Sequence, residues 1–325
     1  MENDNLLTIR NLSVELMTAR GVVHAISGVS LDIYRGNIHG LVGESGCGKS
    51  ITSKSIMRLL PEGRARISGS IDFDGSKLLA LSEKQMAKLR GAEISMIFQE
   101  PMTSLSPLKT ARAQLEGALA NHTNLSRAER RFRAENLLER VGFPRDRAKR
   151  YPFELSGGMR QRVMIAQAIS CNPKLLIADE PTTALDVTIQ AQILALLRDL
   201  QNEYGMSVLF VTHNFGVVSQ ICDRVSVMYA GNIVETAAAE ELLSNPMHPY
   251  TRALIGCIPR GSGQRDRLFA LPGSPPLLYE IPDACRFAPR CKYADEQCLS
   301  APYHRTTGTH TVACHHVSAD SAGGI

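Results

Sequence analysis

Two glycine-rich segments, far apart in the chain, most constrain what this sequence can fold into. The first matches the G-x-x-x-x-G-K-[ST] pattern at every fixed position and consists of Gly43, Glu44, Ser45, Gly46, Cys47, Gly48, Lys49 and Ser50. The second, residues 155–161, reads LSGGMRQ and precedes an apolar run that ends in the acidic pair Asp179 and Glu180. Backbone N–H groups of the first pattern surround phosphates. Either segment alone suggests nucleotide binding, and the two together indicate a specific kind of nucleotide-driven protein.

The size and charge of the chain favour one large domain with an appendage. It has 325 residues and a formal net charge of +4. Such a small charge requires no broad nucleic-acid-binding face, so we expect no nucleic-acid partner. The sequence has no apolar stretch of about 18 residues or more, and its polar N-terminus is unlike a signal peptide. We therefore expect a cytosolic chain whose eight cysteines are not a disulfide framework.

The phosphate-binding pattern lies in the local context that it requires. Alternating apolar residues predict strands within residues 6–42, and the apolar run 38–42 ends directly in the loop. Beyond Ser50, apolar residues at helical spacing predict a helix that stops at Pro61. This context favours a phosphate site over a structural glycine turn. Lys49 is then expected to reach the β- and γ-phosphates, and Ser50 to bind Mg²⁺.

The rest of the pattern predicts an α/β core that is interrupted by helices. Two capping-box patterns, Ser82 to Gln85 and Ser126 to Glu129, begin amphipathic stretches within a helical insertion at about residues 77–160. Beyond it, strands and helices alternate, which is typical of a parallel sheet. The expected elements are the strand 174–178, the helix 186–201 and the strands 207–212 and 225–230.

Polar residues at the ends of predicted strands are candidates for the chemistry of hydrolysis. Asp179 suits the Mg²⁺ shell, and Glu180 is placed to deprotonate an attacking water. Gln99 and His213 each follow an apolar strand and are candidates for sensing the γ-phosphate. A lone histidine at a strand end is more often a satisfied core residue, but its position after the acidic pair favours a catalytic role. The expected Mg²⁺ ligands are Ser50, Gln99 and Asp179.

Taken together, residues 6 to about 235 resemble the ATP-binding subunit of an ABC transporter. The motifs occur in the order of that family: the phosphate loop, Gln99, residues 155–161, the acidic pair, Asp186 and His213. The resemblance implies a P-loop NTPase core with an antiparallel β subdomain. It also implies that Ser156, Gly157 and Gly158 bind the γ-phosphate in trans, on a nucleotide held by a second ATPase subunit. Asp186 would link the two ATP sites.

Three further segments, 98–107, 178–188 and 248–254, resemble the dipeptide and oligopeptide importers within that family. This resemblance implies an ATPase that energises peptide import at the cytoplasmic face of the inner membrane, as a peripheral subunit. Its implied partners are two permease subunits, a substrate-binding protein and a second, different ATPase subunit. Residues 101–110, with Met102 and Leu105, are expected to receive the coupling helix of a permease.

Other functions remain open at this stage. Nickel and other small-solute importers share the same segments. An exporter ATPase, a subunit with inactive catalytic machinery and a soluble ABC ATPase without a transport role are further alternatives. The chain also departs from the family in two places. No aromatic residue lies between Ser13 and Ile26 to stack on adenine, which leaves Arg20 or a backbone contact, and Asn214 follows His213 where aspartate is common.

The predicted ATPase domain covers residues 6–245, and residues 246–325 form an irregular extension rich in proline and cysteine. This extension contains Cys285, Cys291, Cys298 and Cys314. Four thiolates suit a tetrahedral Zn²⁺ or a [4Fe–4S] cluster. The spacings lack the paired C-x₂₋₄-C units that are usual for structural zinc. Similar extensions in peptide-importer ATPases are associated with a [4Fe–4S] cluster, so we expect iron–sulfur, with zinc and no metal as alternatives.

Overall fold

The computed structural model describes residues 5–183, 185–257, 271, 273–276, 279–280, 283–302 and 304–317, apart from the side chains of residues 101 and 102. The chain forms two compact units. The first comprises the residues up to Leu6, Tyr34–Asn37 and Ala80–Val211; the second comprises Leu7–Ile33, Ile38–Leu79 and the residues from Thr212 onward. Among the described residues, no helix has both the length and the apolar character needed to span a membrane.

A parallel sheet forms the centre of the first unit. Its strands follow the order β8 (Ser207–Thr212), β7 (Leu175–Asp179), β6 (Ile94–Ile97). All five residues of β7 are buried, and only the last, Asp179, is polar. A strand that is covered on both faces carries such a continuous apolar run. The parallel sheet predicted from the alternation of strands and helices is therefore confirmed.

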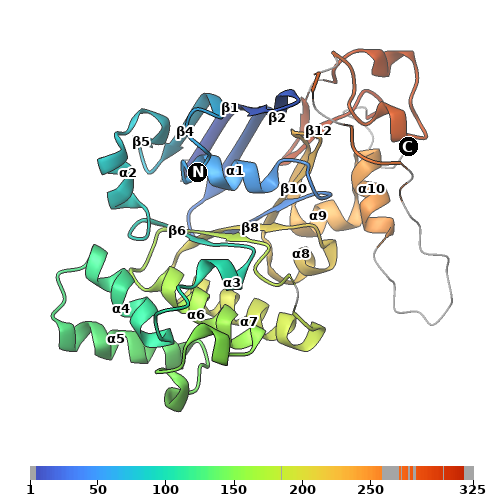
Figure 1. Cartoon of the computed structure of the whole chain (residues 1–325). Coiled ribbons are helices and arrows are strands. Elements are labelled where there is room, and N and C mark those ends of the chain that lie inside the picture. The colour runs from blue at the N-terminus through green and yellow to red at the C-terminus, as the bar shows by residue number, and fades with distance from the viewer. Residues whose placement is uncertain are drawn as a thin grey trace. The chain divides into compact units, whose positions relative to one another are not determined.

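The helices of the first unit begin where local sequence signals place them. The side chains of Ser82 and Ser126 each accept the backbone N–H of the residue three positions on. In return, the side chains of Gln85 and Glu129 accept the backbone N–H groups of the two serines. Both predicted capping boxes are confirmed. The helices α4 and α5 contact each other and lie side by side in Figure 1. The six α-helices described in this unit are α2 (Glu83–Leu89), α3 (Pro101–Ser104), α4 (Ala111–His122), α5 (Arg127–Arg140), α6 (Gly157–Ile169) and α7 (Val187–Tyr204).

The second unit contains the antiparallel sheet that the resemblance implies. Its strand order is β2-β1-β4-β5, and β1 pairs antiparallel with β4. Ile9 and Val14 of β1 are fully buried, as expected for the apolar face of such a strand. These strands are β1 (Asn5–Thr18), β2 (Gly21–Tyr34), β4 (Ala65–Phe73) and β5 (Ser76–Lys77).

A second group of strands in this unit supports the phosphate loop. The strand β3 (Ile38–Val42) pairs parallel with β9 (Arg224–Tyr229), and β9 pairs antiparallel with β10 (Asn232–Ala238). The hairpin of β11 (His304–Thr307) and β12 (His310–Ala313) continues from β10. The helices are α1 (Lys49–Ile56), α8 (Phe215–Ile221), α9 (Ala239–Ser244) and α10 (Pro249–Gly256).

The extension is thus more regular than its sequence predicts. Its last strand, β12, pairs with β10, and the strands of this hairpin are too short for alternation to reveal them. A small cluster of buried side chains, Met247, Val312, Cys314 and Val317, fixes the hairpin further. The predicted division at residue 245/246 stays a prediction.

A buried acid–histidine pair ties the hairpin to β10. His310 Nε2 lies 2.7 Å from Glu235 Oε1, and neither side chain is exposed. His310 Nδ1 lies 3.1 Å from Glu241 Oε1. Burial alone lowers the pKa of His310, but the bonds and charges of Glu235 and Glu241 outweigh it, so the pKa is raised. The backbone N–H groups of Met247 and His248 also donate to Glu235.

We expect the substitution His310→Gln to destabilise the chain mainly below neutral pH. Because the folded pKa of His310 is raised, its contribution is complete below the unfolded value of about 6.5 and is lost as the pH rises through the folded value. Leaving Glu235 buried without its charged partner costs about 3 kcal/mol. Urea unfolding from acidic to alkaline pH should show the gap to wild type shrinking as the pH rises. Thr307→Gln, on the exposed part of the same hairpin, is the control, and a gap that does not depend on pH would contradict the role of His310.

Candidate nucleotide-binding and hydrolysis site

The phosphate loop runs from the end of β3 into α1, as the sequence predicts. Space is the first constraint on it, because a Cβ built on Gly43 would lie only 2.1 Å from the carbonyl oxygen of Met228. Conformation is the second, because Gly48 has a φ of 111° and a Cβ there would lie 2.9 Å from Ala25 O. Only glycine satisfies both positions. The loop therefore packs backbone to backbone against the end of β9.

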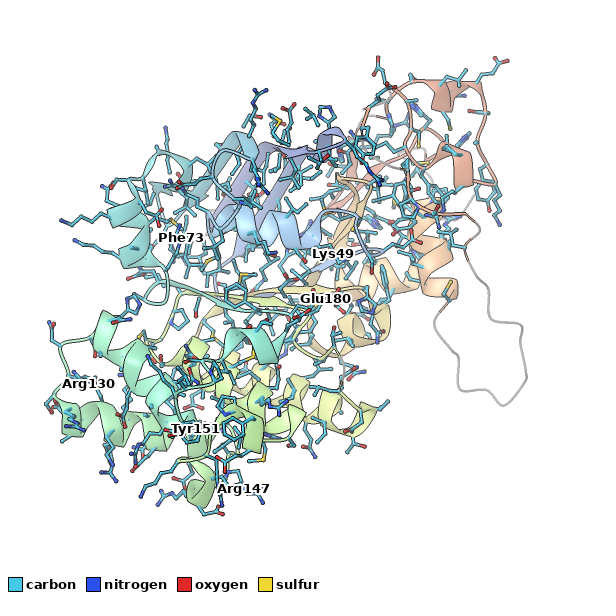
Figure 2. The ribbon with its side chains drawn as sticks, in the orientation of Figure 1. Lys49, Phe73, Arg130, Arg147, Tyr151 and Glu180 are labelled. Atoms are coloured by element: carbon cyan, nitrogen blue, oxygen red, sulfur yellow. The ribbon has the colours of Figure 1, made fainter. Side chains whose placement is uncertain are left out.

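Lys49 lies at the start of α1, labelled in Figure 2, and is only 4% exposed. Its ammonium group donates to the carbonyl oxygens of Gly43 and Glu44, at 2.7 and 2.9 Å. The cation is thus held within the loop, where phosphate oxygens can take the place of these carbonyls. Burial raises the pKa of Cys47, although Lys49 opposes this effect. A neutral Cys47 thiol fits its place at a free position of the motif.

The first unit brings Gln99 and Glu180 together, although they are distant in sequence. Gln99 Nε2 donates to Glu180 Oε2 at 3.1 Å, and Thr183 Oγ1 donates to the same oxygen at 2.9 Å. Glu180 has a φ of 50°, which is the left-handed region, and its N–H donates to Val211 O at 2.9 Å. Such a conformation at a non-glycine residue costs about 1 kcal/mol or more and is concentrated at functional sites. Asp179, just before it, is only 3% exposed.

His213 follows β8 directly and belongs to the second unit, as does the phosphate loop. Its side chain is exposed, so a ligand can reach it. The next residue, Asn214, caps α8 by accepting the N–H of Gly216 at 2.9 Å. Asparagine and aspartate both serve as helix caps, so this departure from the family pattern has a local structural explanation.

The segment at residues 155–161 leads into α6. Ser156 caps this helix through the N–H of Met159, and both Ser156 and Gly157 are exposed. A Cβ on Gly158 would lie 3.0 Å from Ile189 of α7, so a larger residue there would press on that helix. N–H groups in the first turn of a helix lack partners within the helix and attract anions. Asp186 caps α7 through the N–H of Ile189 at 2.9 Å.

In the region expected to receive a permease, residues 101–110, one side chain differs from its predicted exposure. Leu105 is only 2% exposed, so the prediction that it lies at a docking surface is wrong. Leu108, by contrast, is 86% exposed. The side chain of Met102 lies outside the described residues. Nearby is a cavity of about 420 Å³, whose lining includes Phe98, Ser104, Lys109, Gln114 and Met164.

Backbone N–H groups point at three of the four cysteines in the extension. Tyr293 N–H donates to Cys291 Sγ at 3.4 Å, and the N–H groups of Phe287 and His316 serve Cys285 and Cys314 in the same way. Burial raises the pKa of all three thiols, and charges on the other cysteines would raise that of Cys314 further. Three thiols that receive N–H bonds, together with Cys298, whose charge would act on all three, form a donor set that a cation would stabilise as thiolates.

One further group of donors lies beside these thiols. Single donor atoms of Asp295, Cys298 and His316 all lie within 4.8 Å of one another. Cys298 Sγ is 3.6 Å from His316 Nε2. The Cys298 backbone also accepts the N–H of Cys285 at 3.0 Å, which links two of the four cysteines directly.

Sequence reasoning missed two aromatic residues near the loop and the first hairpin. The Tyr250 hydroxyl accepts the N–H of Glu44 at 3.0 Å. The segment at residues 248–254, which resembles peptide importers, was a recognisable signal for Tyr250, but not for its contact with Glu44. Tyr279 lies near the first hairpin, 4.0 Å from where a Cβ on Gly21 would be. It approaches the stretch from Ser13 to Ile26, which carries no aromatic residue of its own.

Known proteins match nearly the whole chain. The family model described as "ABC transporter" matches residues 26–183, and "Oligopeptide/dipeptide transporter, C-terminal region" matches residues 234–298. The chain is 50% identical to the oligopeptide transport ATP-binding protein AppD of Bacillus subtilis, over 90% of each protein. It is 46% identical to the dipeptide transport ATP-binding protein DppD of the same organism, over 96% of this chain and 94% of that protein.

Solved structures agree with this relationship. The dimeric ATP-binding cassette MJ0796, in a post-hydrolysis state with ADP and phosphate, is 30% identical with a TM-score of 0.65. The match covers 72% of this chain and 98% of that one. The fold is therefore that of an ABC ATPase cassette, as the sequence predicted. The chain belongs to the ABC transporter family, in its group of oligopeptide and dipeptide transport ATP-binding proteins.

Proposed function

We propose that this chain hydrolyses ATP to drive the import of dipeptides or oligopeptides. The proposal rests on Glu180, which follows β7 and whose carboxylate accepts a hydrogen bond from Gln99. The same chain contains a complete phosphate loop. The names and identities of the relatives support peptides as the cargo. Nickel or another small solute is the alternative cargo.

Each site residue then has a role in ATP hydrolysis. The N–H groups of residues 43–50 and the ammonium of Lys49 hold the phosphates, as a preformed cradle for anions. The hydroxyl of Ser50, the amide oxygen of Gln99 and the carboxylate of Asp179 are the oxygen ligands that Mg²⁺ prefers. Bound Mg²⁺ neutralises charge on the phosphates. Glu180 accepts a proton from the attacking water, and His213 contacts the γ-phosphate.

We expect Glu180→Gln to lower ATP turnover about a hundredfold or more while ATP affinity changes little. The amide keeps the size of the side chain but cannot accept the proton, and general-base catalysis contributes about 10²–10⁴ in rate. Turnover and nucleotide binding should be measured on the same preparations. Glu203→Gln, an exposed carboxylate of the same unit, is the matched control. Unchanged turnover in Glu180→Gln would remove Glu180 from this role.

The exposed start of α6 suits an action on another subunit's nucleotide. Ser156, Gly157 and Gly158 would bind the γ-phosphate of ATP held by a second ATPase subunit, and Asp186 would link the two sites. The dimeric state of the similar cassette MJ0796 supports pairing. We propose that the second subunit is a different chain. Two permeases and a substrate-binding protein complete the assembly at the cytoplasmic face of the inner membrane.

Residues 101–110 are the proposed docking site for a permease. The large exposed side chain of Leu108, close in sequence to the lining of the 420 Å³ cavity, is the apolar anchor that such an interface uses. Leu105 supports this surface from inside, because it is buried.

We expect Leu108→Glu to reduce peptide uptake by a reconstituted transporter about tenfold, which corresponds to a loss of about 1.4 kcal/mol at the interface. ATP affinity of the isolated subunit should stay at the wild-type value, because Leu108 lies outside the phosphate loop. Phe132→Glu provides a control at an exposed apolar residue of α5. Wild-type uptake by the Leu108→Glu complex would refute docking at this residue.

For the four cysteines of the extension, we propose a [4Fe–4S] cluster. Support comes from the N–H bonds to three of the sulfur atoms and from the charge that Cys298 would exert on these three thiols. Zn²⁺ and no metal remain the alternatives. A bound cluster would link residues 285, 291, 298 and 314 and so stabilise a segment with few core residues.

Anaerobic purification should give a brown protein that absorbs broadly near about 400 nm and contains about four irons per chain. Cys298→Ala should lose the colour and the iron, whereas Cys257→Ala, outside the set, should keep both. A colourless wild-type preparation with about one zinc per chain, or with no metal, would overturn the cluster.

A further inference from the structure

The turn between two of the four cysteines reaches back to the phosphate loop. Arg290 donates to both carboxylate oxygens of Glu44, at 2.7 and 3.0 Å. The Arg290 side chain is only 5% exposed and that of Glu44 is 26% exposed. Bidentate pairs between arginine and carboxylate are among the strongest side-chain contacts, and this one is largely withdrawn from water. Glu44 is a free position of the phosphate-loop pattern, so the motif itself does not require this contact.

Glu44 is also held from its backbone side. Its N–H donates to the Tyr250 hydroxyl, and the Tyr250 ring packs against Phe287 with centroids 5.4 Å apart. Tyr229 packs edge-on against both rings, at 4.7 and 5.2 Å. The guanidinium carbon of Arg290 lies 5.8 Å from the Tyr229 ring centre. The extension therefore fixes the position of Glu44 through Arg290 and Tyr250, and aromatic rings pack around both residues.

A second contact leads from the same turn to the loop. Arg286 Nη1 donates to Ala230 O, and the next N–H, that of Gly231, donates to Cys47 O at 2.8 Å. Arg286 is only 8% exposed. Two arginines of the turn thus reach the phosphate loop, one directly and one through residues 230–231.

The turn itself is compact. Ala288 N–H donates to Cys285 O at 3.0 Å, Arg290 N–H to Phe287 O at 2.9 Å and Cys291 N–H to Ala288 O at 3.1 Å. These successive bonds fix the two cysteines at its ends relative to the arginines between them. Only a few hydrogen-bonded residues therefore separate Cys285 and Cys291 from Arg290.

We propose that Arg290 is a positioning residue of the phosphate loop, and that the turn from Cys285 to Cys291 sets ATP affinity through it. The proposal rests on the ATP site proposed above, but not on which metal, if any, the cysteines bind. The physical reason is charge. A carboxylate next to bound phosphates repels them, and Arg290 neutralises that carboxylate while fixing its direction. Without Arg290, the negative charge of Glu44 would stay beside the triphosphate.

The test measures ATP affinity by calorimetry on the full chain, with Glu180→Gln in every sample to prevent hydrolysis. Arg290→Met should raise the Kd for ATP about tenfold, which is about 1.4 kcal/mol. Adding Glu44→Gln should restore the affinity to nearly that of Glu44→Gln alone, because the unneutralised charge is gone. Arg290→Lys should retain most of the wild-type affinity. A purely structural role of Arg290 would not predict rescue by removing the carboxylate.

Arg305→Met is the matched control, because Arg305 donates to Val317 O within the extension. Arg305→Met should change thermal stability about as much as Arg290→Met does. Its ATP affinity, in contrast, should stay close to that of the parent chain. Wild-type affinity in Arg290→Met, or no rescue by Glu44→Gln, would overturn the proposal. Failure of the parent Glu180→Gln chain to bind ATP would instead overturn the proposed function.

A second arm tests the link to the cysteines. Cys291→Ser should weaken ATP binding in the chain with Arg290, and should add no further loss in the Arg290→Met chain. Cys257→Ser, at a cysteine outside the turn, should leave affinity unchanged. Equal ATP affinity of Cys291→Ser and the parent chain would disprove transmission from the turn.

Discussion

The structure depends on how closely the phosphate loop packs against the chain behind it. A loop whose N–H groups converge on phosphates must bend sharply, and its glycines leave no room for side chains. At Gly43 a Cβ would meet the carbonyl oxygen of Met228, and at Gly48 it would meet the Met228 side chain and the carbonyl oxygen of Ala25. β9, the start of β2 and residues 230–231 must therefore be placed before the loop can take its shape. The second unit is organised around this requirement.

The carboxylate chemistry of the first unit follows a different principle. Glu180 occupies a left-handed conformation that its side chain does not favour. The N–H bond to Val211 O fixes its backbone, while Gln99 and Thr183 fix its carboxylate. These hydrogen bonds offset the backbone strain and hold the carboxylate in one orientation. The general-base role that we propose for Glu180 needs such fixed geometry more than it needs an unstrained backbone.

The extension is an integral part of the second unit. Glu235 is fully buried, and it accepts bonds from two backbone N–H groups as well as from His310. An unpaired buried carboxylate would be costly, so the strand β12 that supplies His310 completes the core around β10. The rings of Tyr229, Tyr250 and Phe287 join the same region to the phosphate loop. Residues that look like a loosely patterned appendage thus complete both the sheet and the nucleotide loop.

The sequence by itself determined the features that depend on local chemistry. The glycine loop, the caps at Ser82 and Ser126 and the strand ends that carry Gln99, Asp179 and His213 all follow from residue type and short spacing. Only the tertiary structure decided which residues meet. It placed Leu105 in the core, joined Gln99 to Glu180 and brought Arg290 to Glu44, 246 residues away. Burial and hydrogen-bond partners depend on packing between distant segments. The periodicity of one segment does not indicate which distant residues cover it.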